Sequence, residues 1–234
     1  MSDIVEPRRA FIIAAGAVGL AGLVVGACKR DEDEIEVTAN EDLMREHGVI
    51  RRALFVYAEA GRRALKDPSS IPLASVSEAA KLFRQFAEDY HERALEEAHI
   101  FPVVRKLKAP VAHLPDVLLA QHTRGREITD YVQRVAGRGR IAAGEAERFA
   151  AALESFVAMY GPHAAHEDTV LFPAWKAAVG AHGYAEMGDA FEELEQKMLG
   201  RDGFEDALAR IARIEQAFGM GDLSAVTAPP PPPA

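Results

Sequence analysis

The sequence is poor in cysteine, in aromatic residues and in basic charge, and each shortage narrows what the protein can be. Cys28 is the one cysteine among 234 residues, so the chain can form no internal disulfide, no cysteine-ligated zinc finger and no cysteine-ligated iron–sulfur cluster. Its 27 basic residues face 36 acidic ones, a net charge of -9, which argues against nucleic acid as a partner because phosphate binding needs a basic surface. Any metal site must therefore use histidine, aspartate and glutamate.

The composition and the placement of helix breakers predict a helical protein. An aromatic share of only 7% and abundant alanine favour helices over a β-sandwich. Pro68, Pro110 and Gly137 separate long helical segments, and Gly161-Pro162 predicts a kink within the fourth. Because the connections are short, we expect an all-α fold, an up-down antiparallel four-helix bundle with additional short C-terminal helices. The expected helices span about residues 40–66, 75–107, 115–136, 142–179, 184–199 and 204–218.

The first 28 residues have the features of an export signal. Arg8-Arg9 precede an uncharged run over residues 10–28, which is too short and too rich in glycine and alanine to favour a membrane span. The adjacent arginines suggest the twin-arginine route, although the rest of that consensus is incomplete. Small residues directly before Cys28 resemble the lipidation signal of bacterial lipoproteins. We therefore expect an exported protein on the periplasmic side, anchored to the membrane through lipidated Cys28; the alternative is an uncleaved apolar anchor helix.

Composition divides the chain into five segments. The charged run after Cys28 carries no core pattern, and the C-terminal end is mostly proline, so both should be solvated. The expected segments are a signal and lipoprotein leader (1–28), a polar linker (29–40), a four-helix bundle (41–180), a C-terminal helical extension (181–220) and a Pro-rich disordered tail (221–234).

Two stretches of the chain resemble each other. Residues 96–102 and 167–173 both read acid, acid, two residues, aliphatic, Phe, Pro. A histidine precedes each stretch, His91 in the first and His163 in the second. The helix before each also carries one conspicuous histidine, followed four residues later by an arginine: His47 with Arg51, and His122 with Arg126. The sequence therefore looks like two copies of one helix pair.

This repeat predicts a metal site in the bundle core. Residues four apart share a helix face, so His163 and Glu167 can reach one point, and a pseudo-symmetric bundle brings both halves to a shared centre. Four imidazoles and at least two carboxylates suit iron or manganese, with zinc possible. Bridging carboxylates can hold two such ions about 3.5–4 Å apart.

The spacing from His91 to Glu96 is five residues rather than four. On an ideal α-helix these side chains would point about 140° apart. Either two metal ions spread their ligands over a wide arc, or the helix contains a π-bulge, as helices often do at functional sites. We favour the wide arc.

Taken in order, His47, the His91…Glu96 stretch, His122 and the His163…Glu167 stretch with its Leu-Phe-Pro ending resemble the hemerythrin, or HHE cation-binding, domain. The resemblance covers about residues 40–180. It implies an up-down four-helix bundle with a non-haem di-iron centre, in a family whose members bind dioxygen, sense oxygen, iron or nitric oxide, or handle reactive species.

One ligand of that family's oxygen carriers is missing. Those proteins carry two histidines one turn apart on the third helix, whereas His122 has Leu118 and Arg126 at these positions. Glu92 is the expected replacement, with His166 as its competitor. The metal ligands implied are His47, His91, Glu92, Glu96, His122, His163 and Glu167, around two iron ions, with manganese or zinc as the alternatives.

Three functions remain open from the sequence. The first is a di-iron protein that binds or reacts with dioxygen, peroxide or nitric oxide. The second is an iron-binding, sensing or storage module without turnover, and the third is a structural lipoprotein that has lost its metal. Whether the protein is an enzyme stays open, as does its oligomeric state. Nothing in the sequence indicates nucleophilic catalysis. The chain has no Gly-rich phosphate loop and no G-x-S-x-G element.

Overall fold

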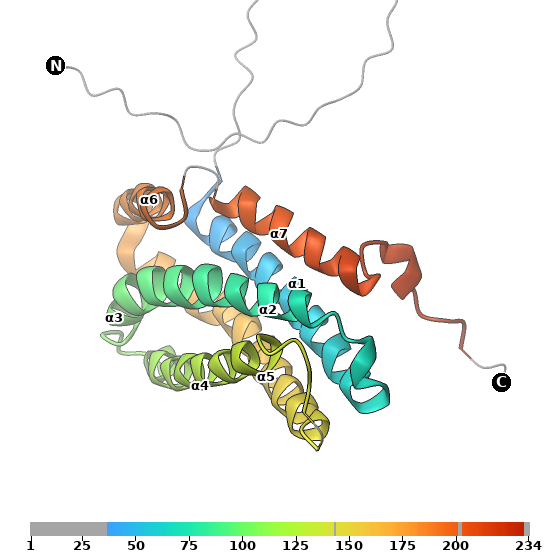
Figure 1. Ribbon diagram of the computed structural model, residues 1–234. Helices are drawn as coiled ribbons and strands as arrows, with labels where there is room; N and C mark the ends of the chain where they lie inside the picture. The colour runs from blue at the N-terminus through green and yellow to red at the C-terminus, as the bar shows by residue number, and fades with distance from the viewer. Residues whose placement is uncertain (1–36, 143, 201–202, 232–234) are drawn as a thin grey trace, which may run out of the picture.

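The computed structural model describes residues 37–142, 144–200 and 203–231, and over these ranges the chain forms helices and turns and no strand. The expected leader with Cys28, and residues 29–36 of the expected linker, lie outside the described residues. Four long helical segments form a bundle, and the chain continues into further helices that pack on it (Figure 1). The all-α bundle with extra C-terminal helices is thus confirmed. Among the described helices, none has a stretch long and apolar enough to cross a bilayer.

The first two bundle segments are a capped α-helix and a longer helix with a π-helical centre. The first, α1 (Ala39–Lys66), starts at Thr38, whose side chain accepts a hydrogen bond from the Glu41 backbone N–H. The second is one continuous helix made of α2 (Leu73–Leu82), η2 (Phe83–Ile100) and α3 (Phe101–Val104), since the backbone stays helical at both junctions. Its central stretch, η2, is π-helical, with hydrogen bonds between residues five apart.

The other two bundle segments are α4 (Leu114–Ala136) and α5 (Ala146–His166). The helix of α5 runs on through Pro162 and continues as the π-helical η4 (Glu167–Leu171) and then α6 (Phe172–Leu199). The real break comes at Gly180, whose φ of 71° and ψ of 175° are not helical. A glycine suits this position because side chains strongly disfavour positive φ.

The C-terminal helix α7 (Gly203–Phe218) lies alongside α1 and also contacts α2 (Figure 1). Its apolar face, which includes Phe204, Ile211 and Phe218, is buried in the same hydrophobic core as the bundle. The Arg52 guanidinium reinforces this packing by binding Glu215, with Nε 2.9 Å from Oε1. The short helix η5 (Leu223–Val226) follows, within the stretch expected as a tail.

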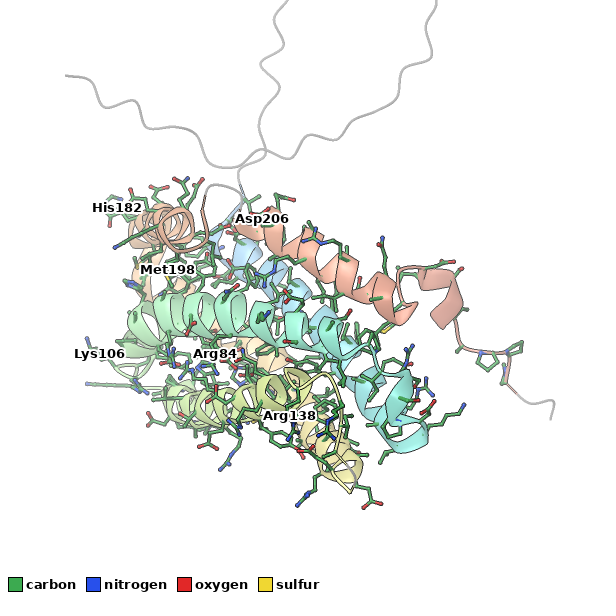
Figure 2. The ribbon with its side chains drawn as sticks, viewed as in Figure 1. Arg84, Lys106, Arg138, His182, Met198 and Asp206 are labelled. Atoms are coloured by element: carbon green, nitrogen blue, oxygen red, sulfur yellow. The ribbon has the colours of Figure 1, made fainter. Side chains whose placement is uncertain are left out.

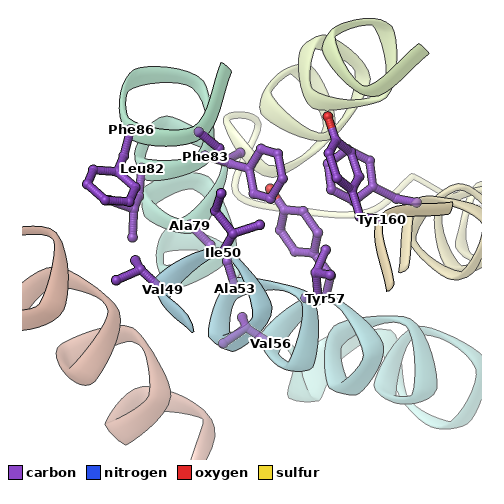
Figure 3. Close-up of a cluster of buried hydrophobic side chains, with 14 of the residues drawn as sticks. Val49, Ile50, Ala53, Val56, Tyr57, Ala79, Leu82, Phe83, Phe86 and Tyr160 are labelled. Atoms are coloured by element: carbon purple, nitrogen blue, oxygen red, sulfur yellow. The ribbon is translucent and has the colours of Figure 1, made fainter. Parts of the chain in front are cut away.

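Four aromatic side chains pack together in the bundle core. Tyr57, Phe83 and Tyr160 (Figure 3) surround Phe156, and ring centroids within this group lie 4.6–6.2 Å apart, several of them edge to face. Next to this apolar layer lies a polar one, since Tyr160 also packs against His163 at 5.1 Å. The aromatic side chains therefore pack directly against the buried polar side chains.

Candidate metal centre

Six of the residues selected from the sequence converge in the bundle core. They come from all four bundle segments, and their side chains are almost completely removed from solvent, with His163 the most exposed at 5%. Two overlapping sets within this group could each bind one metal ion. One set is His47, His91 and Glu96, and the other is Glu96, His122, His163 and Glu167. We refer to His47, His91, Glu96, His122, His163 and Glu167 as the central cluster.

The four histidines form two pairs. The Nε2 atoms of His47 and His91 lie 3.0 Å apart, and those of His122 and His163 lie 3.1 Å apart. Two nitrogens each about 2.1 Å from one metal ion and at right angles to each other would be about 3.0 Å apart. The spacing within each pair therefore fits two ligands of one ion.

The two carboxylates lie between the pairs. Glu96 Oε1 is 3.6 Å from His91 Nε2, and its Oε2 is 3.4 Å from His122 Nε2. Glu167 behaves in the same way, with Oε2 3.5 Å from His47 Nε2 and Oε1 3.1 Å from His163 Nε2. Each carboxylate thus presents one oxygen to each histidine pair, which is the arrangement of a bridging ligand.

All four of these carboxylate oxygens are buried without a hydrogen-bond partner. Burial raises the pKa of Glu96, and it raises that of Glu167 to about 8. Burying carboxylates in this way costs free energy unless cations compensate for the lost water. The donor set therefore fits two divalent ions better than it fits an ordinary core.

Three of the four histidines are prepared to donate lone pairs. Burial lowers the pKa of His47 to about 3 and that of His163 to about 4, and it also lowers the pKa of His122. These three imidazoles are thus neutral near pH 7, as metal ligation requires. Burial acts in the same direction on His91, but neighbouring carboxylates, Glu96 first among them, outweigh it and raise the pKa.

Each histidine donates its other ring N–H to an acceptor outside the central cluster. This contact fixes the orientation of the ring, and in the neutral ring it leaves the Nε2 lone pair facing the centre. The Nδ1 contacts are His47 to Asp168 at 2.6 Å, His91 to Glu46 at 2.5 Å, His122 to Glu97 at 2.9 Å and His163 to Gln121 at 2.8 Å.

Arginines complete two of these contacts. Arg51 binds Asp168, and Arg126 binds Glu97. Glu97 is half-buried, and burial would raise its pKa, but the hydrogen bonds from His122 and Arg126 hold it at about 2. The repeated arginines of the sequence therefore support the acceptors of His47 and His122.

The sequence interpretation missed the role of these acceptors. Glu97 and Asp168 entered the sequence analysis only as the second acid of each repeated stretch, and Glu46 and Gln121 did not enter it. A signal was present, since Glu46 and Gln121 each directly precede the first histidine of their half. In both halves a hydrogen-bond acceptor occupies the same place in the repeat.

The five-residue spacing between His91 and Glu96 results from the π-helix η2. In a π-helix a hydrogen bond joins residues five apart, so these two side chains project from one face about one turn apart. Our preference for ligands spread over a wide arc of an α-helix was wrong; the alternative had the right geometry, but the π-helix extends over the 18 residues of η2 rather than forming a one-residue bulge.

The structure does not bring Glu92 or His166 into the central cluster. Glu92 is buried, but it accepts hydrogen bonds from Tyr160 at 2.7 Å and Arg126 at 3.0 Å, and it lies 3.9 Å from His122 on the Nδ1 side. His166 is exposed, and its ring contacts the Pro162 carbonyl oxygen. Metal ligation by Glu92 stays a prediction, and it requires this side chain to reorient.

Tyr160 is held in place by a close helix approach. Its hydroxyl points toward α4 (Figure 3), where a Cβ built on Gly125 would lie 2.1 Å from the tyrosine oxygen. Only glycine leaves room for the Tyr160–Glu92 hydrogen bond.

His182 takes no part in this site. It lies on the outer surface of α6 (Figure 2), and its side chain is 90% exposed.

A helical bundle whose core collects histidines and carboxylates from four segments defines a class of metal-binding protein. The hemerythrin HHE cation binding domain matches residues 38–175, and the chain belongs to this family. It is also similar to the uncharacterized proteins Rv1995 of Mycobacterium tuberculosis and Mb2018 of Mycobacterium bovis. Each is 39% identical over 199 residues, which cover 84% of this chain and 76% of the relative. No solved structure matches the chain.

Proposed function

We propose that the central cluster binds two iron ions and that the protein binds or reacts with dioxygen, peroxide or nitric oxide. One observation carries this proposal: four buried carboxylate oxygens without hydrogen bonds face two pairs of imidazole nitrogens. Mixed nitrogen and oxygen ligation suits iron, with manganese or zinc as the alternatives. Family membership supports cation binding in general, while the choice of iron rests on the donor set.

The proposed ligands divide into two equal groups. His47 and His91 would hold one ion, His122 and His163 the other, and Glu96 and Glu167 would contribute one oxygen to each. Each ion then has four protein donors, which leaves positions free for a small molecule on a metal that accepts six ligands. When bound, such a pair of ions supplies redox chemistry and a binding site for small oxidants or gases.

The surrounding side chains restrict what can reach the centre. Phe172 stacks on His47 and Phe101 stacks on His122, each with ring centroids 5.5 Å apart. Both phenylalanines are fully buried. These apolar walls exclude bulky polar substrates and limit water, which favours small uncharged ligands.

Iron content and an optical spectrum test the proposal. The chain would be reconstituted with ferrous iron without air and then exposed in separate samples to dioxygen, peroxide and nitric oxide. We expect two irons per chain and a near-ultraviolet band typical of a di-ferric centre after oxidation. A Glu96→Gln, Glu167→Gln double variant should lose this band, whereas the exposed-surface variant His182→Ala should keep it.

The outcomes separate the candidate functions. Two bound irons with a spectrum that no oxidant or gas alters would favour the storage or sensing module without turnover. A chain that purifies with no metal and accepts none would refute the metal centre altogether and leave the structural lipoprotein.

We also propose that the protein is exported and anchored through lipidated Cys28. Support for this comes only from the sequence of residues 1–28. Cells fed a labelled fatty acid should incorporate the label into the wild-type chain, and Cys28→Ala should abolish incorporation and release the protein from the membrane fraction. Equal labelling of both forms would exclude this anchor.

A further inference from the structure

The two halves of the metal centre differ in one outer contact. In the first half, Glu46 directly precedes His47 and accepts a hydrogen bond from His91 Nδ1 at 2.5 Å. In the second half, Gln121 occupies the same place before His122 and accepts from His163 Nδ1 at 2.8 Å. The repeat thus places a carboxylate against one histidine pair and a neutral amide against the other.

The other outer contacts are alike in the two halves. His47 donates to Asp168, which Arg51 binds, and His122 donates to Glu97, which Arg126 binds. The second half has one further carboxylate, since Glu92 also binds Arg126 and lies 3.9 Å from His122 Nδ1. Among the groups that accept a hydrogen bond directly from a histidine ring, the halves differ in charge at Glu46 and Gln121.

The surroundings of these two residues reinforce the contrast. Glu46 is 1% exposed, and its second oxygen accepts a hydrogen bond from the Tyr90 hydroxyl at 2.9 Å, so the carboxylate is held in a fixed position. Gln121 is only half-buried, and the nearby Pro162 and His166 are exposed. Within the second pair, His163 is the most exposed of the four histidines at 5%, whereas His122 is fully buried.

A carboxylate acceptor makes an imidazole a stronger metal ligand. It draws the Nδ1 proton away and raises the electron density at Nε2, and a hydrogen bond to an ionised group is roughly twice as strong as a neutral one. Outer hydrogen-bond partners of this kind typically change metal affinity about 10–100-fold. An amide oxygen orients the ring equally well but carries no charge.

From this contrast we infer that the His47–His91 position binds the first metal ion and holds it more tightly, and that Glu46 is the positioning residue that sets this order. The ion at the His122–His163 position binds second and is lost first. This inference rests on the proposed dinuclear centre and adds to it an affinity order between its two positions.

Isosteric swaps at the two equivalent positions test it. Cobalt(II) would be titrated into the metal-free full chain, with visible absorption and calorimetry recording each binding step. The wild type should show two steps separated about 10–100-fold. Glu46→Gln should weaken the tight step by a similar factor, and Gln121→Glu should strengthen the weak one. Both variants should keep the wild-type helix content by circular dichroism, and a binding change without a structural change excludes misfolding.

Ligand deletions assign the steps to positions. His163→Ala should retain the tight step and lose the weak one, whereas His91→Ala should lose the tight step. Two ions bound with equal affinity, or affinities unchanged in both Gln121→Glu and a folded Glu46→Gln, would overturn the inference alone. Failure of the wild type to bind cobalt would instead refute the proposed metal centre.

Discussion

Replacing Glu167 by glutamine should stabilise the metal-free protein at pH 8. In the folded chain the Glu167 carboxyl is buried without a hydrogen bond, and burial raises its pKa from 4.5 to about 8. The unfolded chain therefore ionises this group more readily than the folded chain, and the folded state loses stability as pH rises. Each pH unit well below the folded-state pKa is worth about 1.4 kcal/mol, so the cost of burying this group reaches about 4 kcal/mol at pH 8.

Glutamine removes the charge but leaves an amide to be buried. An unpaired buried amide costs about 1–3 kcal/mol, so the net stabilisation expected for Glu167→Gln at pH 8 is about 1–3 kcal/mol. Whether the stability of the folded protein rises or falls with pH depends on the pH range. The lowered pKa values of His47 and His163 make stability rise with pH up to about 6.5, so the comparison belongs between pH 7 and 8, where these histidines are neutral in both states.

The assay is urea unfolding followed by far-ultraviolet circular dichroism, with the chelated chain at pH 7 and pH 8. Wild type should lose about 1 kcal/mol more than Glu167→Gln over this pH unit, because the folded-state carboxyl is itself half ionised at pH 8. Glu186→Gln, at an exposed position on α6, is the matched control and should behave like wild type. Identical pH dependence in wild type and Glu167→Gln would refute the reasoning. With metal bound the order should reverse, because the variant loses an anionic ligand.

Three further substitutions probe the surroundings of the centre. Gly125→Ala should destabilise the fold by about 1–3 kcal/mol in urea unfolding, because the new methyl group would overlap the Tyr160 hydroxyl; unchanged stability would contradict this packing. Ile211→Ala should cost about 2–5 kcal/mol in a single transition, since this side chain anchors α7 in the common core, whereas a separate early transition would show that α7 unfolds independently. Asp168→Asn should weaken metal binding by about tenfold or more in a cobalt(II) titration, and an unchanged affinity would exclude a role for the charge beside His47.

Local sequence features were enough to predict most of the fold. The helix α1 was expected over residues 40–66 and spans Ala39–Lys66, because a capping residue and a proline-rich break mark its ends. The helix α4 was expected over residues 115–136 and spans Leu114–Ala136, because Pro115 lies in its first turn and Gly137 directly follows it. The fourth helix was expected over residues 142–179 with a kink at Gly161-Pro162, and the chain is helical through Pro162 and breaks at Gly180, next to the expected end.

The sequence was enough to predict the candidate metal ligands, but not the side chains that surround them and form hydrogen bonds with them. The internal repeat identified the four histidines and two glutamates that meet in the core, because residues one turn apart on a helix share a face. Glu92 was selected from position alone, but its carboxylate turns toward Tyr160 and Arg126. The direction of a side chain depends on neighbours from other helices, which sequence spacing does not specify.

The amino-acid sequence by itself determined the helical segments, the duplication and the inventory of imidazole and carboxylate donors, since these follow from periodicity, helix breakers and residue chemistry. Tertiary structure decided how those donors are paired. Glu97 reaches His122 from a different helix, and Asp168 reaches His47 across 121 residues of sequence. Packing also selected the π-helical geometry that aligns His91 with Glu96. Contacts between helices depend on their rotation and crossing, and only the folded core fixes these.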